Sequence, residues 1–339
     1  MLKHEAEKRA AIFPEISRPN NKLSLEPVSA SSKRLSAQAL GFEGKKPMVR
    51  PRRSLLFMPG SNARALEKAR ILPADGIILD IEDSVAPEAK ALARDQIAQA
   101  IAAGGFGKRE IWIRTNALDS PWWVDDVKMA AKIRPDGILV PKVSSVEDIA
   151  TIARCLRDAD ADPSMRLWTM IETARAVLHA EALAAASRGV EPRLAGFVFG
   201  PNDISRETRI RMQVGRATML PLIMHCILAT RAYGLEIFDG PYSDFSNVNG
   251  FGQECTQARD LGFDGKTLIH PGQIEACNAI FTPPADEVAQ ARKIIAAFEL
   301  PENASRGAIS LDGQMVERLH ADMARRTIAI ADSIAALGH

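Results

Sequence analysis

The sequence predicts an α/β protein in which eight strand–helix units close into a (β/α)8 barrel. The first observation is a rhythm: from Arg53 onward, short runs rich in apolar and β-branched residues alternate with Ala-rich amphipathic stretches. The second is that most of these runs are apolar at consecutive positions, as expected of parallel strands buried on both faces. The third is that no GxGxxG motif follows the first run, which disfavours the competing doubly wound open sheet.

Eight strands in succession are the number that closes a TIM barrel. In order, the expected strands are residues 54–60, 76–83, 110–117, 137–143, 166–173, 195–203, 235–242 and 265–271. The segments between them carry helix signals. Ser84 and Pro87 open the helix after the second strand, because proline is tolerated in a first helical turn. Ser145 followed by Asp148 resembles a capping arrangement, and the Ala-rich stretch 176–187 favours helix.

The two ends of the chain differ from the barrel, which is expected over residues 51–283. Residues 1–50 mix charged residues, Ser, Pro and Asn with little apolar periodicity, which predicts a flexible extension. A start at Met48 is the alternative. A C-terminal helical segment is expected over residues 284–339, either folding back or docking on a neighbouring subunit. Its helices are expected at 285–299 and 314–337, joined by a linker at 301–314.

Composition excludes several classes of function. Lys and Arg total 43 against 42 for Asp and Glu, so no basic excess indicates a nucleic-acid partner. No stretch approaches the roughly 18 apolar residues that a membrane span needs. The four cysteines lie far apart without a CxxC motif, which favours reduced thiols in a cytoplasmic protein over disulfides or a zinc site.

Charged side chains recur where the expected strands end. They are Asp80, Glu82, Asp83, Arg114, Lys142, Glu172, Asp203, Asp239 and His270. In barrels of this kind the active site lies at the C-terminal ends of the strands. Because the strands themselves are otherwise apolar, this recurrence predicts an active site at that end of the barrel.

Glu172 and Asp203 are the candidate metal ligands. Adjacent strands lie about 4.8 Å apart, so carboxylates at neighbouring strand ends can share one cation. Two carboxylates without His or Cys favour a hard ion, Mg²⁺ or alternatively Mn²⁺. Such an ion keeps coordination positions for water or for a chelating 2-oxo acid. The alternative is that each acid forms an ion pair with a basic neighbour such as Arg114 or Lys142.

Arg114 ends the strand IWIRTN, where its guanidinium can bind a substrate carboxylate or stabilise an enolate oxygen. Lys142 is expected to contact substrate as well. The acids Asp80, Glu82 and Asp83 are expected to support the site from behind, by orienting Arg114 or reaching the metal through water. The alternative for Arg114, an ion pair with this acidic cluster, is compatible with both roles.

His270, at the last strand end, is expected to support the site; a hydrogen-bonded structural histidine is the alternative. Motifs for other chemistries are missing from the sequence: there is no P-loop, no GxSxG elbow and no HExxH. Cys226 and Cys255 fall on expected helices away from the strand ends, so covalent catalysis is unsupported.

Seven segments together resemble the citrate lyase β-subunit-like branch of the HpcH/HpaI aldolase family. They are RRSLLFMPGSNARALEKA, ILDIEDSVAPEAKALAR, IWIRTNALDSPWWVDD, GILVPKV, MIETARAVLHA, GFVFGPNDIS and GFDGKTLIHPGQI. The resemblance runs from about Arg52 to the C-terminus. The sequence departs from it at GPND, where many members have GTND. It implies a TIM barrel, Mg²⁺ and a CoA thioester, with the metal on Glu172 and Asp203 and a substrate oxygen on Arg114.

The same resemblance implies that Asp312, in LDGQMVE, is an acid/base group delivered from a neighbouring subunit, and hence a homo-oligomer, a trimer or a hexamer. An ordinary turn residue is the alternative for this Asp-Gly pair. The implied reaction is cleavage of a 3-hydroxy-dicarboxylyl-CoA such as malyl-CoA or citramalyl-CoA to a 2-oxo acid and acetyl-CoA. Hydrolysis of malyl-CoA at the thioester, and a non-catalytic scaffold, are the alternatives.

Overall fold

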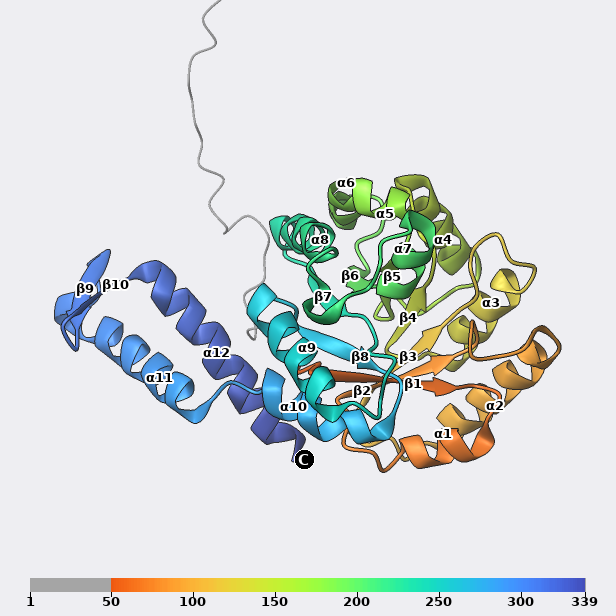
Figure 1. Cartoon of the computed structure of the whole chain (residues 1–339), viewed down its shortest axis with the longest axis horizontal. Helices are drawn as coiled ribbons and strands as arrows, with labels where there is room; N and C mark the ends of the chain where they lie inside the picture. The colour runs from red at the N-terminus through yellow and green to blue at the C-terminus, as the bar shows by residue number, and fades with distance from the viewer. Residues whose placement is uncertain (1–49, 339) are drawn as a thin grey trace, which may run out of the picture. The chain divides into compact units, whose positions relative to one another are not determined.

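A computed structural model describes residues 50–338, and the barrel expected from the sequence is confirmed (Figure 1). Eight parallel strands pair in chain order and close on themselves, β8 against β1. They are β1 Ser54–Pro59, β2 Gly76–Asp80, β3 Glu110–Arg114, β4 Gly137–Val140, β5 Arg166–Ile171, β6 Leu194–Phe199, β7 Glu236–Asp239 and β8 Gly265–Leu268. The extension expected over residues 1–50 and the start at Met48 fall almost wholly outside the described residues.

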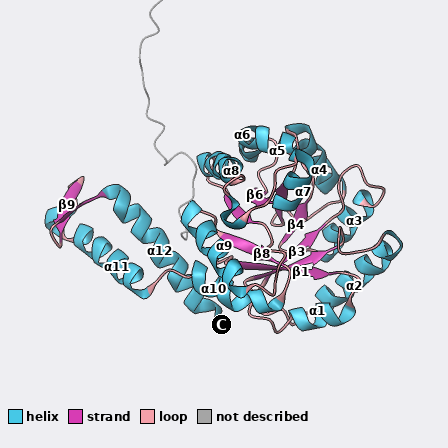
Figure 2. Cartoon of the chain, viewed as in Figure 1, coloured by secondary structure: helices cyan, strands magenta, loops and turns pink. Residues whose placement is uncertain are grey.

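Helices surround the strands, as the separate colours of Figure 2 show. They are α1 Ala63–Ala69, α2 Lys90–Ala103, α3 Trp123–Ile133, α4 Val146–Asp158, α5 Ala174–Leu178, α6 Ala180–Ala185, α7 Pro201–Thr208, α8 Leu220–Ala232, α9 Val248–Leu261 and α10 Ile274–Phe281. The capping arrangement expected at Ser145 and Asp148 is present at the start of α4. None of the helices between residues 50 and 338 is long and apolar enough to cross a membrane.

Aromatic side chains fill the barrel interior. The rings of Trp112 and Trp168 stack with centroids 4.3 Å apart, and Phe238 lies 5.2 Å from Trp168. All three are fully buried. Room for Trp168 comes from glycine on both neighbouring strands: a Cβ at Gly196 would approach the indole to 2.8 Å, and one at Gly137 to 3.2 Å. Arg114 lies two positions beyond Trp112 and Glu172 four beyond Trp168, so strand alternation places the aromatic layer below these polar residues.

The strands end earlier than expected, because the polar residues that follow them belong to loops and helix starts. The correction matters most for Asp203, expected at the end of the sixth strand. The strand stops at Phe199, Gly200 is the N-cap, and Pro201 occupies the first position of α7. Asp203 therefore lies in the first turn of that helix, where a proline start is favoured.

The C-terminal segment holds two long helices, α11 Ala285–Glu299 and α12 Arg318–Leu337, which pack side by side (Figure 1). Between them the structure has a feature that the expected linker lacked, an antiparallel hairpin of β9 Ala308–Leu311 and β10 Gln314–Glu317. The turn is Asp312–Gly313, and both residues have positive φ, 49° and 79°. An Asp-Gly pair is a preferred two-residue hairpin turn for this reason. Phe298, Ile309, Val316 and Ala321 form the small core of this segment.

Candidate functional site at the barrel mouth

A pocket of about 400 Å³ opens at the C-terminal end of the strands. Five of the residues predicted from the sequence line it together: Asp80, Asp83, Arg114, Glu172 and Asp203. They come from four parts of the barrel wall, the ends of β2, β3 and β5 and the start of α7. The pocket therefore collects charges of both signs above an apolar, aromatic interior.

Arg114 is held rigidly by Asp80. Nε and Nη2 each lie 2.7 Å from a different carboxylate oxygen, which is the bidentate arrangement that planar guanidinium favours. Arg114 and Asp80 are aligned in the register of β2 and β3. Burial alone would raise the pKa of Asp80, but the charge and hydrogen bonds of Arg114 lower it below its ordinary value. The guanidinium also lies over the ring of Phe57, 4.6 Å from its centroid.

Glu82 links Arg114 to the next strand end. One oxygen lies 2.9 Å from Nη1 of Arg114, and the other accepts a hydrogen bond from the ammonium of Lys142. Burial raises the pKa of Glu82 despite the attraction of both cations. Asp83 is more distant, 4.0 Å from Nη1, and its side chain is mostly exposed. The two acids expected to orient Arg114 therefore differ: Glu82 contacts it directly and Asp83 stands at the rim.

Glu172 is a buried carboxylate, 2% exposed, with little to neutralise it. Its Oε1 accepts a hydrogen bond of 2.7 Å from the backbone N–H of Lys142. Burial and then the like charges of Glu82 and Asp203 raise the pKa of Glu172 to about 8. Asp203 is partly exposed and pairs with Arg206, one helical turn away, at 2.6 Å. The alternative to metal binding was an ion pair of each acid with a basic neighbour: Asp203 has such a partner in Arg206, whereas no side-chain ion pair of Glu172 is found between residues 50 and 338.

The donor set at Glu172 and Asp203 fits a hard divalent cation. A buried carboxylate whose pKa is raised by burial and by neighbouring carboxylates is one that a nearby positive charge would stabilise. No three His, Cys, Asp or Glu side chains gather as metal ligands between residues 50 and 338. Mg²⁺ commonly takes only one or two protein carboxylates and completes its shell with water and substrate oxygens. The residues present are thus compatible with this ion, which these two side chains would hold.

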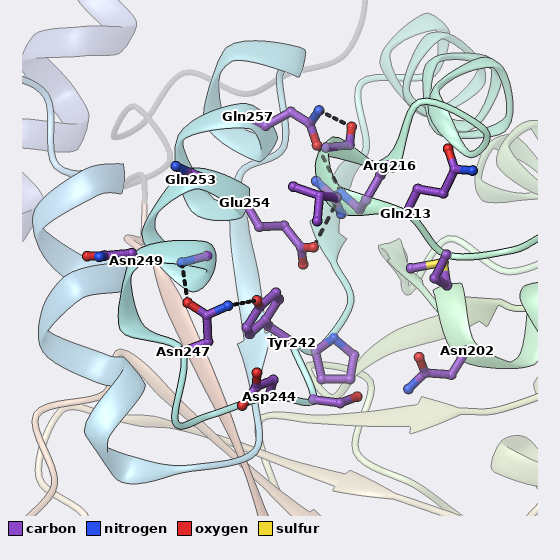
Figure 3. A pocket seen from close by; sticks show the side chains of 16 residues that line it. Asn202, Gln213, Arg216, Tyr242, Asp244, Asn247, Asn249, Gln253, Glu254 and Gln257 are labelled. Carbon is purple, nitrogen blue, oxygen red and sulfur yellow. Dashed lines mark hydrogen bonds and ion pairs between the residues drawn. The ribbon is translucent and has the colours of Figure 1, made fainter.

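Asp239 does not line the mouth pocket, contrary to the expectation from its place in the sequence. It is fully buried, and both Nη1 of Arg216 (2.8 and 2.9 Å) and the ammonium of Lys266 (2.6 Å) contact its carboxylate. Lys266 also bonds to Glu254 at 2.7 Å. This network borders a second pocket of about 500 Å³, which Arg216 and Glu254 line (Figure 3). Asn202 lines both pockets, so they adjoin.

Two other predicted residues lie apart from the mouth pocket. His270 caps the turn Pro271–Gln273 by accepting a hydrogen bond from Gly272 N–H at Nδ1, 3.1 Å, and its ring stacks on Phe245. Asp312, at the hairpin tip, does not line the pocket of its own chain, and its nearest cation is Lys293 at 3.7 Å.

The sequence reasoning missed several pocket residues because they are uncharged. Phe57 and Met170 line the pocket from β1 and β5, and Asn202 lies next to Asp203. The signal for the first two was available. Phe57 is two residues beyond the interior Leu55, and Met170 is two beyond the interior Trp168, so strand alternation places both on the inner face. No comparable signal marks Asn202, which a helix start presents.

A model of the family described as HpcH/HpaI aldolase/citrate lyase matches residues 53–271, the stretch that forms the barrel and carries the mouth pocket. The chain belongs to this family.

Relatives in this family include proteins named for reactions of CoA esters and a solved structure with the same fold. A (3S)-malyl-CoA thioesterase of Cereibacter sphaeroides is 44% identical over 85% of this chain and 97% of its own. An L-malyl-CoA/β-methylmalyl-CoA lyase of the same species is 33% identical over 86% and 98%. The structure of CitE from Mycobacterium tuberculosis, in complex with magnesium, acetoacetate and coenzyme A, covers 82% of this chain and 97% of that one, with TM-score 0.65 and 24% identity. The family thus includes enzymes named for cleaving CoA esters and others named for hydrolysing them.

Proposed function

We propose that this enzyme acts on the CoA thioester of a small 3-hydroxy-dicarboxylic acid such as malyl-CoA, using Mg²⁺ (or Mn²⁺) held by Glu172 and Asp203. The observation that carries the proposal is the convergence of these two carboxylates and a rigid, doubly paired Arg114 on one pocket of about 400 Å³. A bound Mg²⁺ would supply Lewis-acid polarisation of the substrate's hydroxyl or oxo oxygens.

Two reactions of this substrate use the same site. The 44% identity to a malyl-CoA thioesterase favours hydrolysis. In that reaction the oxygen of water bonds to the thioester carbon, the C–S bond breaks, and the thiolate sulfur takes a proton. Arg114 faces the oxygen on which negative charge develops. Its contacts to Asp80 and Glu82 are already formed, so it needs no reorganisation in the transition state.

The second candidate is the carbon–carbon cleavage expected from the sequence, which the lyase among the relatives supports. Here the hydroxyl proton is removed, the C–C bond breaks to give a 2-oxo acid and the enolate of acetyl-CoA, and the enolate carbon takes a proton. Arg114 would stabilise the enolate oxygen. The sequence predicted that Lys142 contacts substrate. In the structure its ammonium donates a hydrogen bond to Glu82, which in turn contacts Arg114.

We further propose that Asp312 of a second subunit supplies the acid/base group, which makes the enzyme a homo-oligomer, a trimer or a hexamer. The hairpin presents Asp312 with 63% of its side chain exposed, and this residue does not line the pocket of its own chain. A general acid or base of this kind contributes roughly 10²–10⁴ in rate.

The Asp312→Asn variant is therefore expected to bind the CoA ester as the wild type does and to lose about 10²–10⁴-fold in kcat. A steady-state assay with a binding measurement checks this. Mixing Asp312→Asn with Glu172→Gln subunits is the control: mixed oligomers are expected to recover activity, because some sites then combine an intact pocket with an intact Asp312. Unchanged kcat in Asp312→Asn would exclude the residue from the mechanism.

Cation binding is expected to release protons. Because the pKa of Glu172 is about 8 in the metal-free protein, this carboxyl is mainly protonated at pH 7. A cation needs the carboxylate, so about 0.9 proton is released per Mg²⁺ at pH 7, falling toward zero above about pH 9. Calorimetry in buffers of different ionisation enthalpy measures this number. A proton release near zero at pH 7 would contradict Glu172 as a ligand.

The function itself is tested by incubating the enzyme with Mg²⁺ and malyl-CoA, then citramalyl-CoA, and following two products in parallel. One assay traps the 2-oxo acid as its hydrazone and the other detects the free thiol of CoA. Free thiol without 2-oxo acid identifies hydrolysis, and 2-oxo acid without free thiol identifies the lyase. If neither product forms and no 2-oxo acid stabilises the protein in the presence of Mg²⁺, both reactions are excluded and the non-catalytic scaffold is favoured.

A further inference from the structure

Lys142 has an unusual backbone for a non-glycine residue. It follows β4 with φ 56°, in the left-handed region where glycine is at ease and side chains with a Cβ are not. Backbone conformations of this kind persist where the surrounding structure requires them, and they cluster at functional sites. Glycine would adopt the same backbone with less strain, so the lysine side chain needs an explanation of its own.

Lys142 contacts two buried acids, Glu172 in the mouth pocket and Glu82 beside Arg114. Its backbone N–H donates to Oε1 of Glu172 at 2.7 Å, and its ammonium donates to Oε1 of Glu82. The second oxygen of Glu82 lies 2.9 Å from Nη1 of Arg114. A continuous series of contacts thus runs from Glu172 through Lys142 and Glu82 to Arg114.

The charges explain why a cation is favoured at this point. Glu82 is 5% exposed and Glu172 is 2% exposed. Two buried carboxylates close together repel each other, and an ammonium bonded to one of them reduces this repulsion. The ammonium is already bonded to Glu82, and both oxygens of Glu82 contact cations.

We propose that Lys142 is a positioning residue that fixes the cation-holding Glu172 and the substrate-facing Arg114 in one geometry. The inference rests on the proposed function, because it takes Glu172 as a ligand and Arg114 as a substrate contact. The backbone N–H acts on Glu172 and the side chain acts on Arg114 through Glu82. The two effects are therefore separable by substitution.

The test uses the full-length oligomer and two probes, Mn²⁺ alone and then pyruvate at saturating Mn²⁺. In Lys142→Gly the backbone N–H and the positive φ are retained and the ammonium is lost. Mn²⁺ affinity is expected to stay within about threefold, and pyruvate affinity to fall about 10- to 100-fold, the usual effect of removing a group that orients a metal-site residue. Lys142→Arg, which keeps a cation for Glu82, is expected to restore pyruvate affinity to within about threefold of the wild type.

Arg134→Gly is the matched control. Arg134 also has a positive φ, 53°, but it caps α3 and its side chain is 72% exposed. Both affinities are expected to be unchanged there. Lys142→Asn, which tolerates the left-handed conformation, replaces Lys142→Gly if that variant does not fold.

The possible results separate the two ideas. If the wild type binds neither Mn²⁺ nor pyruvate, the proposed function is wrong in its cation site. If the wild type binds both and Lys142→Gly binds pyruvate equally well, the positioning role of Lys142 is overturned while the proposed function stands. A loss of pyruvate affinity that Lys142→Arg restores supports the inference.

Discussion

Replacing Glu172 with glutamine is expected to abolish Mg²⁺-dependent turnover while making the metal-free protein more stable at neutral and alkaline pH. Glutamine keeps the size of the side chain but is a poorer ligand for a hard cation. The several kcal/mol that a catalytic cation contributes correspond to a loss of about 10³-fold or more in kcat/KM.

The stability gain follows from the sign of the pKa shift. Folding raises the pKa of Glu172 from its ordinary 4.5 to about 8, so the folded state favours the protonated form. The metal-free wild type therefore loses stability as the pH rises from about 4.5 to about 8, when this carboxyl must ionise in a buried site. Glu172→Gln removes that loss. Chemical denaturation at pH 5 and pH 8 measures it, and equal pH dependence in both proteins would contradict the assignment.

A second buried glutamate serves as the control. Glu191 is 3% exposed and pairs with Arg193 at the start of β6, away from the mouth pocket. Glu191→Gln is expected to leave turnover and Mg²⁺ affinity unchanged and to lower stability, because it removes an attractive pair. The opposite directions of the two stability changes separate a carboxylate poised for a cation from one that is already paired.

The Arg114→Lys variant is expected to lose about 10²–10³-fold in kcat/KM, the usual effect of removing a donor that faces a developing oxyanion. Lysine keeps the charge beside Asp80, so the cost of an unpaired buried carboxylate is avoided. What it loses is the planar fork, which at present makes two bonds of 2.7 Å to Asp80 while Nη1 lies near Glu82.

Arg53→Lys is its matched control. Arg53 is buried and pairs with Asp75 through Nε and Nη2 at 2.9 and 2.7 Å, the same geometry at the opposite end of the barrel. Both variants are expected to lower the denaturation midpoint by similar amounts, but only Arg114→Lys is expected to slow the reaction. Equal activities in the two variants would remove Arg114 from the chemistry.

The barrel was predictable because its signal is local and repeated. Each strand is a short apolar run, and closure requires only that eight of them follow one another. The gathering of Asp80, Arg114 and Glu172 was predictable for the same reason, since strand order fixes which ends are neighbours. Asp239 shows where this reasoning stops. Its partner Arg216 comes from a short, kinked helical turn ahead of α8, and no periodicity in the sequence brings that guanidinium to β7.

The C-terminal hairpin is a different case, because the sequence contains a hairpin signal but the composition around it favoured a linker. Ala308–Leu311 and Gln314–Glu317 flank an Asp-Gly pair, the sequence favoured for a tight hairpin turn. The surrounding Pro, Glu, Asn and Ser residues indicated a linker instead. Strands of four residues give too short a pattern to outweigh that composition, and their apolar partners lie on α11 and α12, distant in sequence.

The aromatic layer of Trp112, Trp168 and Phe238 closes the barrel interior below the mouth pocket. Phe57 and Met170 line the pocket just above this layer, so nothing can pass through the barrel axis to the opposite face. Reactants and products must therefore enter and leave through the same pocket opening, and a product that stays bound in the pocket excludes the next substrate. Product inhibition by a 2-oxo acid or a free dicarboxylic acid is accordingly expected to be competitive with respect to the acyl-CoA ester.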